Sequence, residues 1–326
     1  MAKWALGIRL PGSTLVEIER ALHSGAILRT HLLRPTWHLV ARPDIRWLLR
    51  LTGPRIKARL RARHRHLGLG PVEMRKSRRI IEKALARSGP LPRAELSRHL
   101  AEVGFDNDDN RHAHLLVYAE LDEVIASGPT RDGQPTYALL DERAPQAPKR
   151  EEAEALGMLA VRFFQSHGPA TLADLCWWAG LSVPDGRKAL DAAGRALLRQ
   201  DIGGATYWTA DAPVGESSGA PPLLFLPAFD ELVIAYKDRS ALMPPSKKGA
   251  TIARGGVFYP TVVDNGRIIG LWKRTVTGPA VTIDVELGTA RPARRRLTAT
   301  ASAYAGFLEK KLVWAEASGS RAAVSR

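Results

Sequence analysis

Hydrophobic positions along this chain switch between a helical period and strict alternation, and the switch occurs in the same order twice. In each case three stretches with apolar residues three or four positions apart precede two short stretches of alternation, which predicts three helices and a two-stranded ribbon. A Gly-Pro pair ends the first helix each time, at Gly89-Pro90 and Gly168-Pro169. Counted after a shorter copy at the start of the chain, the second succession is predicted at Ser77–Arg87, Arg93–Val103, Asn107–Leu121 with Asp106 as its cap, Glu123–Ser127 and Thr136–Leu140. The third succession is predicted at Glu151–Ser166, Leu172–Ala179, Pro184–Ala193, Leu197–Ile202 and Thr206–Thr209.

A third, shorter copy precedes these two. A helix at Ser13–His23 and a hairpin formed by Ile27–Leu33 and Leu33–Val40 match only the back half of the unit. Met1–Pro11 is too short for two further helices, so we expect that this copy is either degenerate or begins upstream of the sequence given. Helix, helix, helix and ribbon is the order of a winged helix, a variant of the helix-turn-helix.

The remaining segments join or follow these copies. Two helices, Pro43–Leu51 and Pro54–His66, are predicted between the first and second copies, and Ala144–Pro148 and Ala212–Pro222 read as linkers. Alternation then predicts strands at Leu223–Phe229, Leu232–Tyr236, Val257–Val263, Ile268–Arg274 and Ala280–Leu287, with a hairpin turn at Asn265-Gly266 and a last helix at Arg295–Trp314.

The predicted fold class is therefore α+β, with tandem winged-helix repeats followed by a small β-rich C-terminal domain. We expect a partial winged helix plus linker helices at residues 1–66, a second winged helix at 67–148, a third at 149–212 and the C-terminal domain at 213–326. A chain of 326 residues is long enough for several such modules.

The charge of the chain points to an acidic partner. It has 48 Lys and Arg against 33 Asp and Glu, a formal net charge of +15, and a pI near 10.3. Such an excess is typical of nucleic-acid binding. Cys176 is the single cysteine, which excludes an internal disulfide and a thiolate zinc site. The sequence shows neither a secretory signal nor an apolar run of membrane-spanning length. We therefore expect a cytoplasmic, nucleoid-associated monomer without a cofactor, a metal or a membrane partner.

Basic residues at particular positions are the candidate contacts to double-stranded DNA. Arg55, Arg59 and Arg63 recur every four residues and so share one helical face, where they can follow phosphates. A solvated surface is the alternative reading. The other candidates lie at the first hairpin, at a ribbon tip and on the third helices of the two full copies: Arg34, His38, Arg131, Arg111, Arg187 and Lys188.

Other chemistry has weaker support. His38 can act as an acid or bind phosphate, but a structural histidine is the favoured reading. The segments around Asp230 and Asp238 can hold carboxylates for acid–base work, although an ion-pair lattice between strand ends is the simpler reading. His64 and His66, like His112 and His114, lie two residues apart and would face different sides of a helix, so they are poor joint metal ligands.

Several strings together resemble one known family, the bacterial winged-helix DNA-binding proteins related to the azinomycin-resistance alkylpurine DNA glycosylase. They are AKWALGIR at 2–9, LRT at 28–30, RPTWHLV at 34–40, DIRWL at 44–48, LPAFDE at 226–231, YKDRS at 236–240 and GRIIGLW at 266–272. The resemblance covers nearly the whole chain. It implies three tandem winged helices, DNA binding, and base excision in the characterised members.

The resemblance also places the family's catalytic motif, Gln-any-Gln or Gln-any-Asp, shortly before the segment that matches Lys3–Leu6. This sequence has no such motif there; its glutamines are Gln134, Gln146, Gln165 and Gln200. Arg34-Pro35 also replaces the Arg-Gly expected at the hairpin turn. No catalytic residue is therefore carried over.

Three functions are consistent with these features. The first is a DNA-binding protein of the glycosylase family, without the catalytic glutamines in the sequence as written. The second is a winged-helix transcriptional regulator, and the third is a scaffold whose winged helices bind protein. Three copies and a β-rich domain in one chain favour a monomer that grips DNA from one side, and a scaffold would not need a charge of +15.

Overall fold

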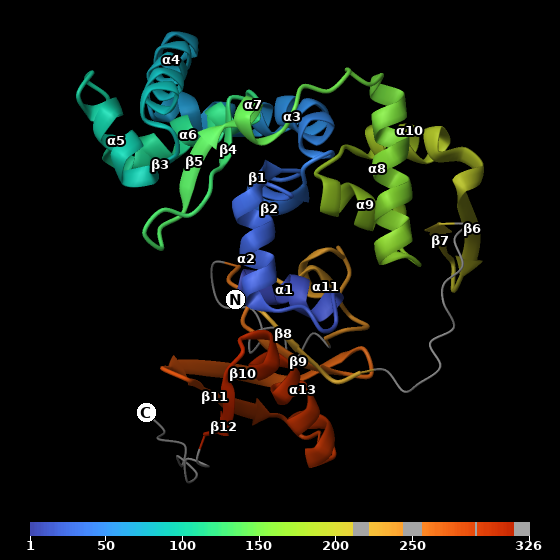
Figure 1. Cartoon of the computed structure of the whole chain (residues 1–326). Helices are drawn as coiled ribbons and strands as arrows, with labels where there is room; N and C mark the ends of the chain where they lie inside the picture. The colour runs from blue at the N-terminus through green and yellow to red at the C-terminus, as the bar shows by residue number, and fades with distance from the viewer. Residues whose placement is uncertain (211–221, 244–255, 291, 316–326) are drawn as a thin grey trace, which may run out of the picture. The chain divides into compact units, whose positions relative to one another are not determined.

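Figure 1 shows the computed structural model of the chain, which describes residues 1–210, 222–243, 256–290 and 292–315. The chain divides into two compact units. Unit 1 comprises Met1–Glu19 and Pro213–Arg326, and unit 2 comprises Arg20–Ala212. The division of the sequence into four domains stays a prediction. The predicted linker at 212–222 lies outside the described residues except for Pro222.

The predicted order of three helices and a ribbon is present between residues 71 and 139. α4 starts six residues earlier than expected because Pro71 sits at its first position and Glu73 accepts a hydrogen bond from the backbone N–H of Gly70 at 3.0 Å. Its apolar face joins a core with α5, α6 and the ribbon in which Ile81, Leu96 and Leu100 are fully buried. The elements are α4 (Pro71–Ser88), β3 (Leu91–Pro92), α5 (Arg93–Ala101), a 3-10 turn (Asp108–Asn110), α6 (Arg111–Leu121), β4 (Ile125–Ser127) and β5 (Thr136–Leu139), with strand order β3-β5-β4.

The third succession follows the same order. α8 and α10 pack closely at Gly157, where an added Cβ would lie about 3.0 Å from the backbone of Ala192, so a larger residue would have to push the two helices slightly apart. Ser182 caps α10 by accepting a hydrogen bond from the backbone N–H of Asp185. The elements are α8 (Glu152–His167), α9 (Leu172–Ala179), α10 (Val183–Ala193), a 3-10 turn (Gly194–Ala196) and the antiparallel pair β6 (Leu197–Ile202) and β7 (Ala205–Ala210).

The helix pair predicted on either side of Pro54 is wrong: a single helix, α3, runs from Ile45 to His66 with Pro54 inside it. A proline removes one backbone hydrogen bond from a helix. Here the side chains of Thr52 and Arg55 donate to the carbonyls of Leu48 and Leu51, at 2.8 and 2.5 Å, beside the proline. The buried face continues through this point with Leu51 and Ile56, so packing keeps the helix continuous.

α3 is the element to which the rest of unit 2 attaches. It contacts β1, α6 and α8. The predicted linker after α7 (Leu140–Arg143) has no regular secondary structure but is tied to α3, since Arg46 donates to the carbonyls of Ala144 and Pro145 at 2.8 Å and Arg50 donates to that of Ala147 at 2.7 Å. The segment therefore fastens the second and third successions to one helix.

Unit 1 is built on a five-stranded sheet with the order β12-β11-β10-β9-β8. The predicted turn at Asn265-Gly266 is confirmed: both residues have positive φ, and Arg267 pairs with Asp264 directly across it. Trp272 of β10 is stacked on Phe225 of β8 and lies edge-on to Tyr304 of α13. The elements are α1 (Ala2–Arg9), β8 (Leu224–Leu226), α11 (Glu231–Ile234), β9 (Thr261–Asp264), β10 (Arg267–Thr277), β11 (Ala280–Leu287), α13 (Arg294–Phe307) and β12 (Lys311–Trp314); α2 (Leu15–Ser24) begins in unit 1 and ends in unit 2.

Two predictions in unit 1 are wrong. The strand expected at 232–236 is the short helix α11, because the Asp230 carboxylate accepts a hydrogen bond from the backbone N–H of Leu232 and so caps a helical turn. The last helix ends at Phe307 and not at Trp314. Glu309 adopts a left-handed conformation and the backbone N–H of Lys310 donates to the carbonyl of Ala305, which closes the helix and starts β12 alongside β11.

Candidate nucleic-acid interface

The β1–β2 hairpin of unit 2 carries several basic and aromatic side chains that are candidates for contact with nucleic acid. β1 (Ile27–Leu32) and β2 (Thr36–Ala41) pair antiparallel, with His31 opposite Trp37. One face of the hairpin is buried through Leu28 and Thr30, and the backbone N–H of Leu33 at its tip donates to the Thr52 hydroxyl of α3. The opposite face therefore carries His31 and Trp37 together with Arg29.

Arg29 and Trp37 form a cation–π pair on this face. The guanidinium carbon of Arg29 lies 4.0 Å from the centroid of the Trp37 ring, and the His31 ring lies 5.6 Å from the same tryptophan. The Trp37 side chain is nevertheless 51% exposed. A flat exposed ring backed by a cation is the kind of surface on which nucleic-acid bases stack.

A second tryptophan lies where the hairpin tip meets the third succession. Trp177 of α9 is 42% exposed, and Arg34 of the tip lies over its ring at 5.9 Å. Gly180 ends α9 with φ +67, and a side chain there would come within 2.5 Å of the carbonyl oxygen of Leu33. Arg59 of α3 donates to the Gly180 carbonyl at 2.7 Å. We call Arg29, Arg34, Trp37, Arg59 and Trp177 the hairpin surface.

The outer edge of β1 is covered by side chains of the second succession. Glu120, which is fully buried, accepts hydrogen bonds from the ring and the backbone N–H of His31, and Ser127 accepts one from the backbone N–H of Arg29 at 2.8 Å. Burial, with a further contribution from the Glu120 carboxylate, raises the pKa of Tyr137 to about 12. The strand edge is thus satisfied by protein groups, which fixes the hairpin against α6 and β4.

The arginine row predicted on α3 is engaged by protein groups. Arg55 pairs with Glu152 at 2.6 Å and approaches Asp185 at 3.4 Å, while Arg59 binds the Gly180 carbonyl. Arg63 lies 3.7 Å from the Asp109 carboxylate. The row therefore braces α3 against α8, α9, α10 and the turn before α6. Its contact with phosphate stays a prediction.

The other predicted DNA contacts have diverse surroundings. Arg111 pairs with Asp106 at 2.6 Å, Arg131 pairs with Glu95, and the His38 ring lies 3.0 Å from the carbonyl of Thr36. Arg187 and Lys188 are exposed on α10, and neither has an ion-pair partner in the part of the chain that the structure describes. Of the nine predicted residues, the structure brings Arg34 and Arg59 together with the two exposed tryptophans.

Asp230 of unit 1 is part of an ion pair, but not the predicted one between strand ends. Arg9 of α1 binds both of its oxygens, at 2.9 and 3.0 Å, and one of these also caps α11. The hydrogen bond to Asp230 raises the pKa of Arg9. The Asp230 side chain is fully buried, so both of its oxygens are committed to protein donors and neither faces solvent as a base.

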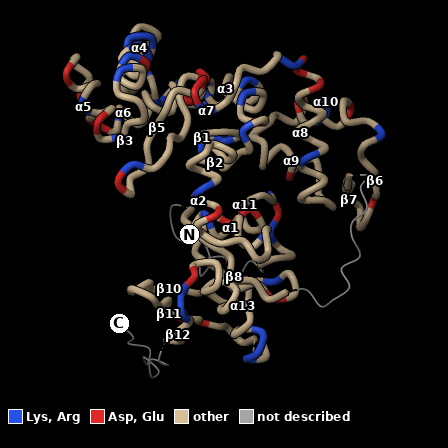
Figure 2. The backbone as a smooth tube through the Cα atoms, in the orientation of Figure 1, with Lys and Arg blue, Asp and Glu red and all other residues tan. Residues whose placement is uncertain are grey.

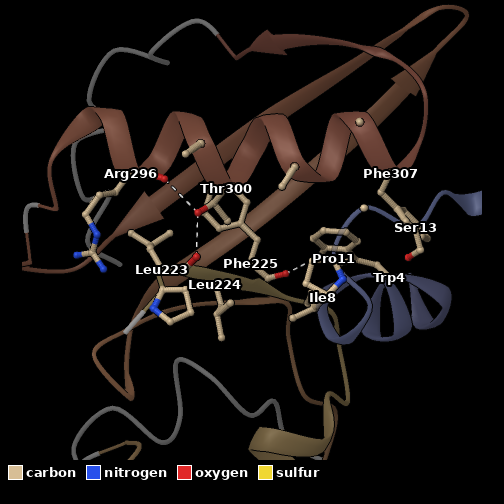
Figure 3. Close-up of a pocket in the computed structure, with 16 residues that line it drawn as sticks. Trp4, Ile8, Pro11, Ser13, Leu223, Leu224, Phe225, Arg296, Thr300 and Phe307 are labelled. Atoms are coloured by element: carbon tan, nitrogen blue, oxygen red, sulfur yellow. Dashed lines mark hydrogen bonds between the residues drawn. The ribbon is translucent and has the colours of Figure 1, made fainter. Parts of the chain in front are cut away.

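Unit 1 also contains an apolar pocket of about 670 Å³ between α1, β8 and α13 (Figure 3). Most of its polar groups are satisfied within the fold: Trp4 donates to the Phe225 carbonyl at 2.7 Å, and the Thr300 hydroxyl shares its proton between the carbonyls of Leu223 and Arg296, at 2.8 and 3.0 Å. The Ser13 hydroxyl is the exception, since it is buried without a hydrogen-bond partner among the described residues. Arg296 is itself paired with Asp264 at 2.7 Å. The pocket therefore has room for an apolar group but few polar groups free to bind or react with a ligand.

Histidines pack together in the core of unit 2. His64 of α3 and His114 of α6 lie edge-on with ring centroids 5.3 Å apart. Burial, aided by His114, lowers the pKa of His64 to about 4, so the ring is neutral near pH 7. Within the described ranges the structure contains no group of three His, Cys, Asp or Glu residues able to hold a metal ion. Those ranges also contain no helix that is long and apolar enough to cross a membrane.

The sequence reading missed Arg29, Trp37 and Trp177 as candidate contacts. The first two could have been found, because two-residue alternation places positions 29, 31 and 37 on one face of the predicted hairpin. Trp177 could not, since its position beside Arg34 depends on how two distant segments pack.

Comparisons with known proteins agree on one group of enzymes. The family model described as "DNA glycosylase AlkZ-like" matches residues 1–307. The "interstrand DNA cross-link repair glycosylase" of Streptomyces sahachiroi is 26% identical over 160 residues, which are 46% of this chain and 43% of that protein, so the alignment spans less than half of the relative's length. The solved structure of the Streptomyces sahachiroi DNA glycosylase AlkZ superposes with a TM-score of 0.70 at 20% identity, covering 91% of this chain and 84% of that one, which shows a shared fold.

Proposed function

The chain belongs to the AlkZ-like DNA glycosylase family, and from this premise we propose that it is a DNA-repair protein that binds duplex DNA through the hairpin surface. The observation that carries the proposal is the pairing of two exposed tryptophans, Trp37 and Trp177, with the guanidinium groups of Arg29 and Arg34. Aromatic rings supply stacking area and arginines supply attraction to phosphate. The net charge of +15 favours the same partner.

We further propose that the successions α4–α5–α6–β4–β5 and α8–α9–α10–β6–β7 are winged helices, and that α2, β1 and β2 are the back half of a third. Support comes from the order of the elements and from the ribbon that follows the last helix in each case. On this proposal β1–β2 is a wing, and its exposed face is presented to DNA while its edge is held by α6.

We also propose that the residues described here supply DNA binding and not the proton transfers of base excision. Two buried carboxylates illustrate this: Oε2 of Glu120 is bound to β1 and its Oε1 is buried away from solvent, while both oxygens of Asp230 are held by Arg9, one of them also by α11. Base excision is therefore tested separately from binding.

The decisive experiment replaces both exposed tryptophans of the hairpin surface. A Trp37→Ala, Trp177→Ala variant should bind a fluorescent 20-base-pair duplex with a central mismatch at least 10-fold more weakly by anisotropy, because a mismatched base can leave the stack and rest on a ring, and loss of such stacking costs about 1–3 kcal/mol per ring. Val276→Ala, which removes an exposed apolar side chain from β10 of unit 1, is the matched control and should bind like the parent. Unchanged affinity of the double variant would remove the hairpin surface from the interface.

The same assay separates this function from that of a transcriptional regulator. A repair protein that reads phosphates and duplex shape should bind unrelated sequences within a few-fold of one another, whereas a regulator typically prefers its site by 10³-fold or more. Competition with a pool of random duplexes decides between them. A single enriched sequence would favour the regulator.

A further inference from the structure

A row of four cations runs along α4 of unit 2. Arg75, Arg79, Lys83 and Arg87 follow one another at four-residue spacing, and all four are exposed. None of these side chains has an ion-pair or hydrogen-bond partner within the described ranges. Figure 2 shows Lys and Arg over much of the length of this helix. We call these four residues the α4 row.

The fold fixes the direction in which the row points. The opposite side of α4 is buried through Met74, Ile81 and Leu85 in the core of the second succession. A helix rises 1.5 Å per residue, so the row extends about 18 Å from Arg75 to Arg87. Because the apolar side is committed to the core, α4 cannot roll to bury its cations, and the row faces solvent along its length.

The contrast with α3 shows that this exposure is specific. Acidic residues of other elements neutralise two members of the α3 row, through Glu152, Asp185 and Asp109. The acids of α4 itself are directed elsewhere: Glu73 caps the start of the helix and Glu82 pairs with Arg78. Like charges four residues apart on a helix repel. A row left without counter-charges is stabilised when a polyanion supplies them.

We propose that the α4 row binds the phosphate backbone of DNA and supplies a salt-dependent share of the affinity that is separate from stacking at the hairpin surface. This inference rests on the proposed function, since it assumes a duplex as the partner. A nucleic acid fits better than an anionic lipid surface, because the apolar side of α4 is buried in its own core and Val72 is the one large apolar side chain that this helix exposes for insertion between lipids.

The test removes the four charges and measures the salt dependence of binding. Arg75→Gln, Arg79→Gln, Lys83→Gln and Arg87→Gln are combined in one variant, since glutamine preserves helix propensity. The matched control carries the same change of charge at exposed positions of unit 1: Arg267→Gln, Lys273→Gln, Arg295→Gln and Lys311→Gln. Circular dichroism and thermal unfolding establish that both variants are folded.

Each phosphate contact contributes about −0.9 to the slope of log K against log salt. The α4 variant should therefore have a slope shallower by up to about 3.6, so between 50 and 200 mM salt the parent loses roughly 100-fold more affinity than the variant does. The control should keep the parent slope to within about one contact. The tryptophan double variant should bind more weakly at every salt concentration with an unchanged slope.

Each other outcome overturns a definite statement. If the α4 variant keeps the parent slope while the tryptophan variant binds weakly, the α4 row is not a phosphate contact and the proposed function stands. If the parent does not bind duplex DNA at 50 mM salt, both are wrong. If the α4 variant loses binding to phosphatidylserine vesicles but keeps its duplex binding, the row belongs to a membrane surface.

Discussion

Arg59 donates a hydrogen bond to the backbone carbonyl of Gly180, 2.7 Å away, although 121 residues separate them in the sequence. The contact joins α3 to the end of α9 at the point where the hairpin tip approaches. Arg59, which the sequence places in a row predicted to contact phosphate, therefore also holds α3 to the third succession. Stability and DNA binding should therefore respond differently to changes in the α3 row and in the α4 row.

Replacing Arg55, Arg59 and Arg63 together with Ala should lower the free energy of unfolding by about 1–3 kcal/mol, because partly exposed ion pairs and a charged hydrogen bond are lost. Urea denaturation measures this, and Arg187→Ala is the control at an exposed position of α10. The same triple variant should flatten the salt slope of DNA binding less than the α4 variant does. A variant of parental stability with a strongly flattened slope would show that the α3 row serves phosphate and not the fold.

Acidification should destabilise the protein through His64. Its pKa is lowered from 6.5 to about 4 by burial, so the unfolded chain takes up a proton at a pH where the folded protein does not. The contribution of this neutral ring is complete above about pH 6.5 and is lost as the pH falls towards 4, by at most about 3 kcal/mol.

His64→Phe should reduce that loss, and His23→Phe, at an exposed position of α2, should not. Urea denaturation of the three proteins at pH 7, 6 and 5 gives the comparison. Equal pH dependence of the parent and His64→Phe would contradict the assignment, whatever the carboxylates contribute, because they are common to all three proteins.

The Arg9–Asp230 pair should behave as a coupled unit. Arg9→Met leaves a buried carboxylate with only its helix-cap partner and should cost about 2–3 kcal/mol, a value at the low end because Arg9 is itself partly exposed. Asp230→Asn should cost a similar amount, and the double variant should cost less than the sum of the two. Thermal unfolding of the four proteins completes the cycle. Additive losses would mean that the two residues contribute independently.

Base excision should be slow in the chain of 326 residues. Duplex containing 7-methylguanine is incubated with the protein and treated to cleave abasic sites, and we expect binding without substantial strand cleavage. The reason is that both oxygens of Asp230 and one oxygen of Glu120 are engaged by protein donors, and the second Glu120 oxygen is buried away from solvent. Rapid excision that is abolished by Asp230→Asn or His38→Ala, in variants that remain folded, would place the chemistry at those residues.

Local features of the sequence predicted much of the fold. Asn265-Gly266 tolerates the positive φ of a tight hairpin, so the turn was found without tertiary information. Pro54 misled because burial on both sides of it outweighs one lost hydrogen bond. The run that begins at Leu232 misled because a short apolar segment fits a strand or a helix, and only the cap at Asp230 decides.

The candidate interface was less predictable for a related reason. Helical spacing shows which cations share a face, but not which acids lie opposite. Arg55 meets Glu152 and Asp185, which are about a hundred residues further along the chain, whereas the α4 row meets no such group among the described residues. Four-residue spacing therefore predicted the α3 row, whose arginines are bound by protein groups. It did not single out the α4 row, whose cations have no counter-charge among the described residues.

The carboxylate of Glu120 has a consequence for the entropy of binding. Because it holds the edge of β1 at His31, the hairpin is ordered before any DNA arrives. Ordering a loose loop on binding subtracts from affinity, and a hairpin that is already fixed avoids that loss. Loosening this contact would leave Trp37 and Arg29 chemically intact. Affinity for DNA would nevertheless fall, because the hairpin would lose conformational entropy each time it became ordered on binding.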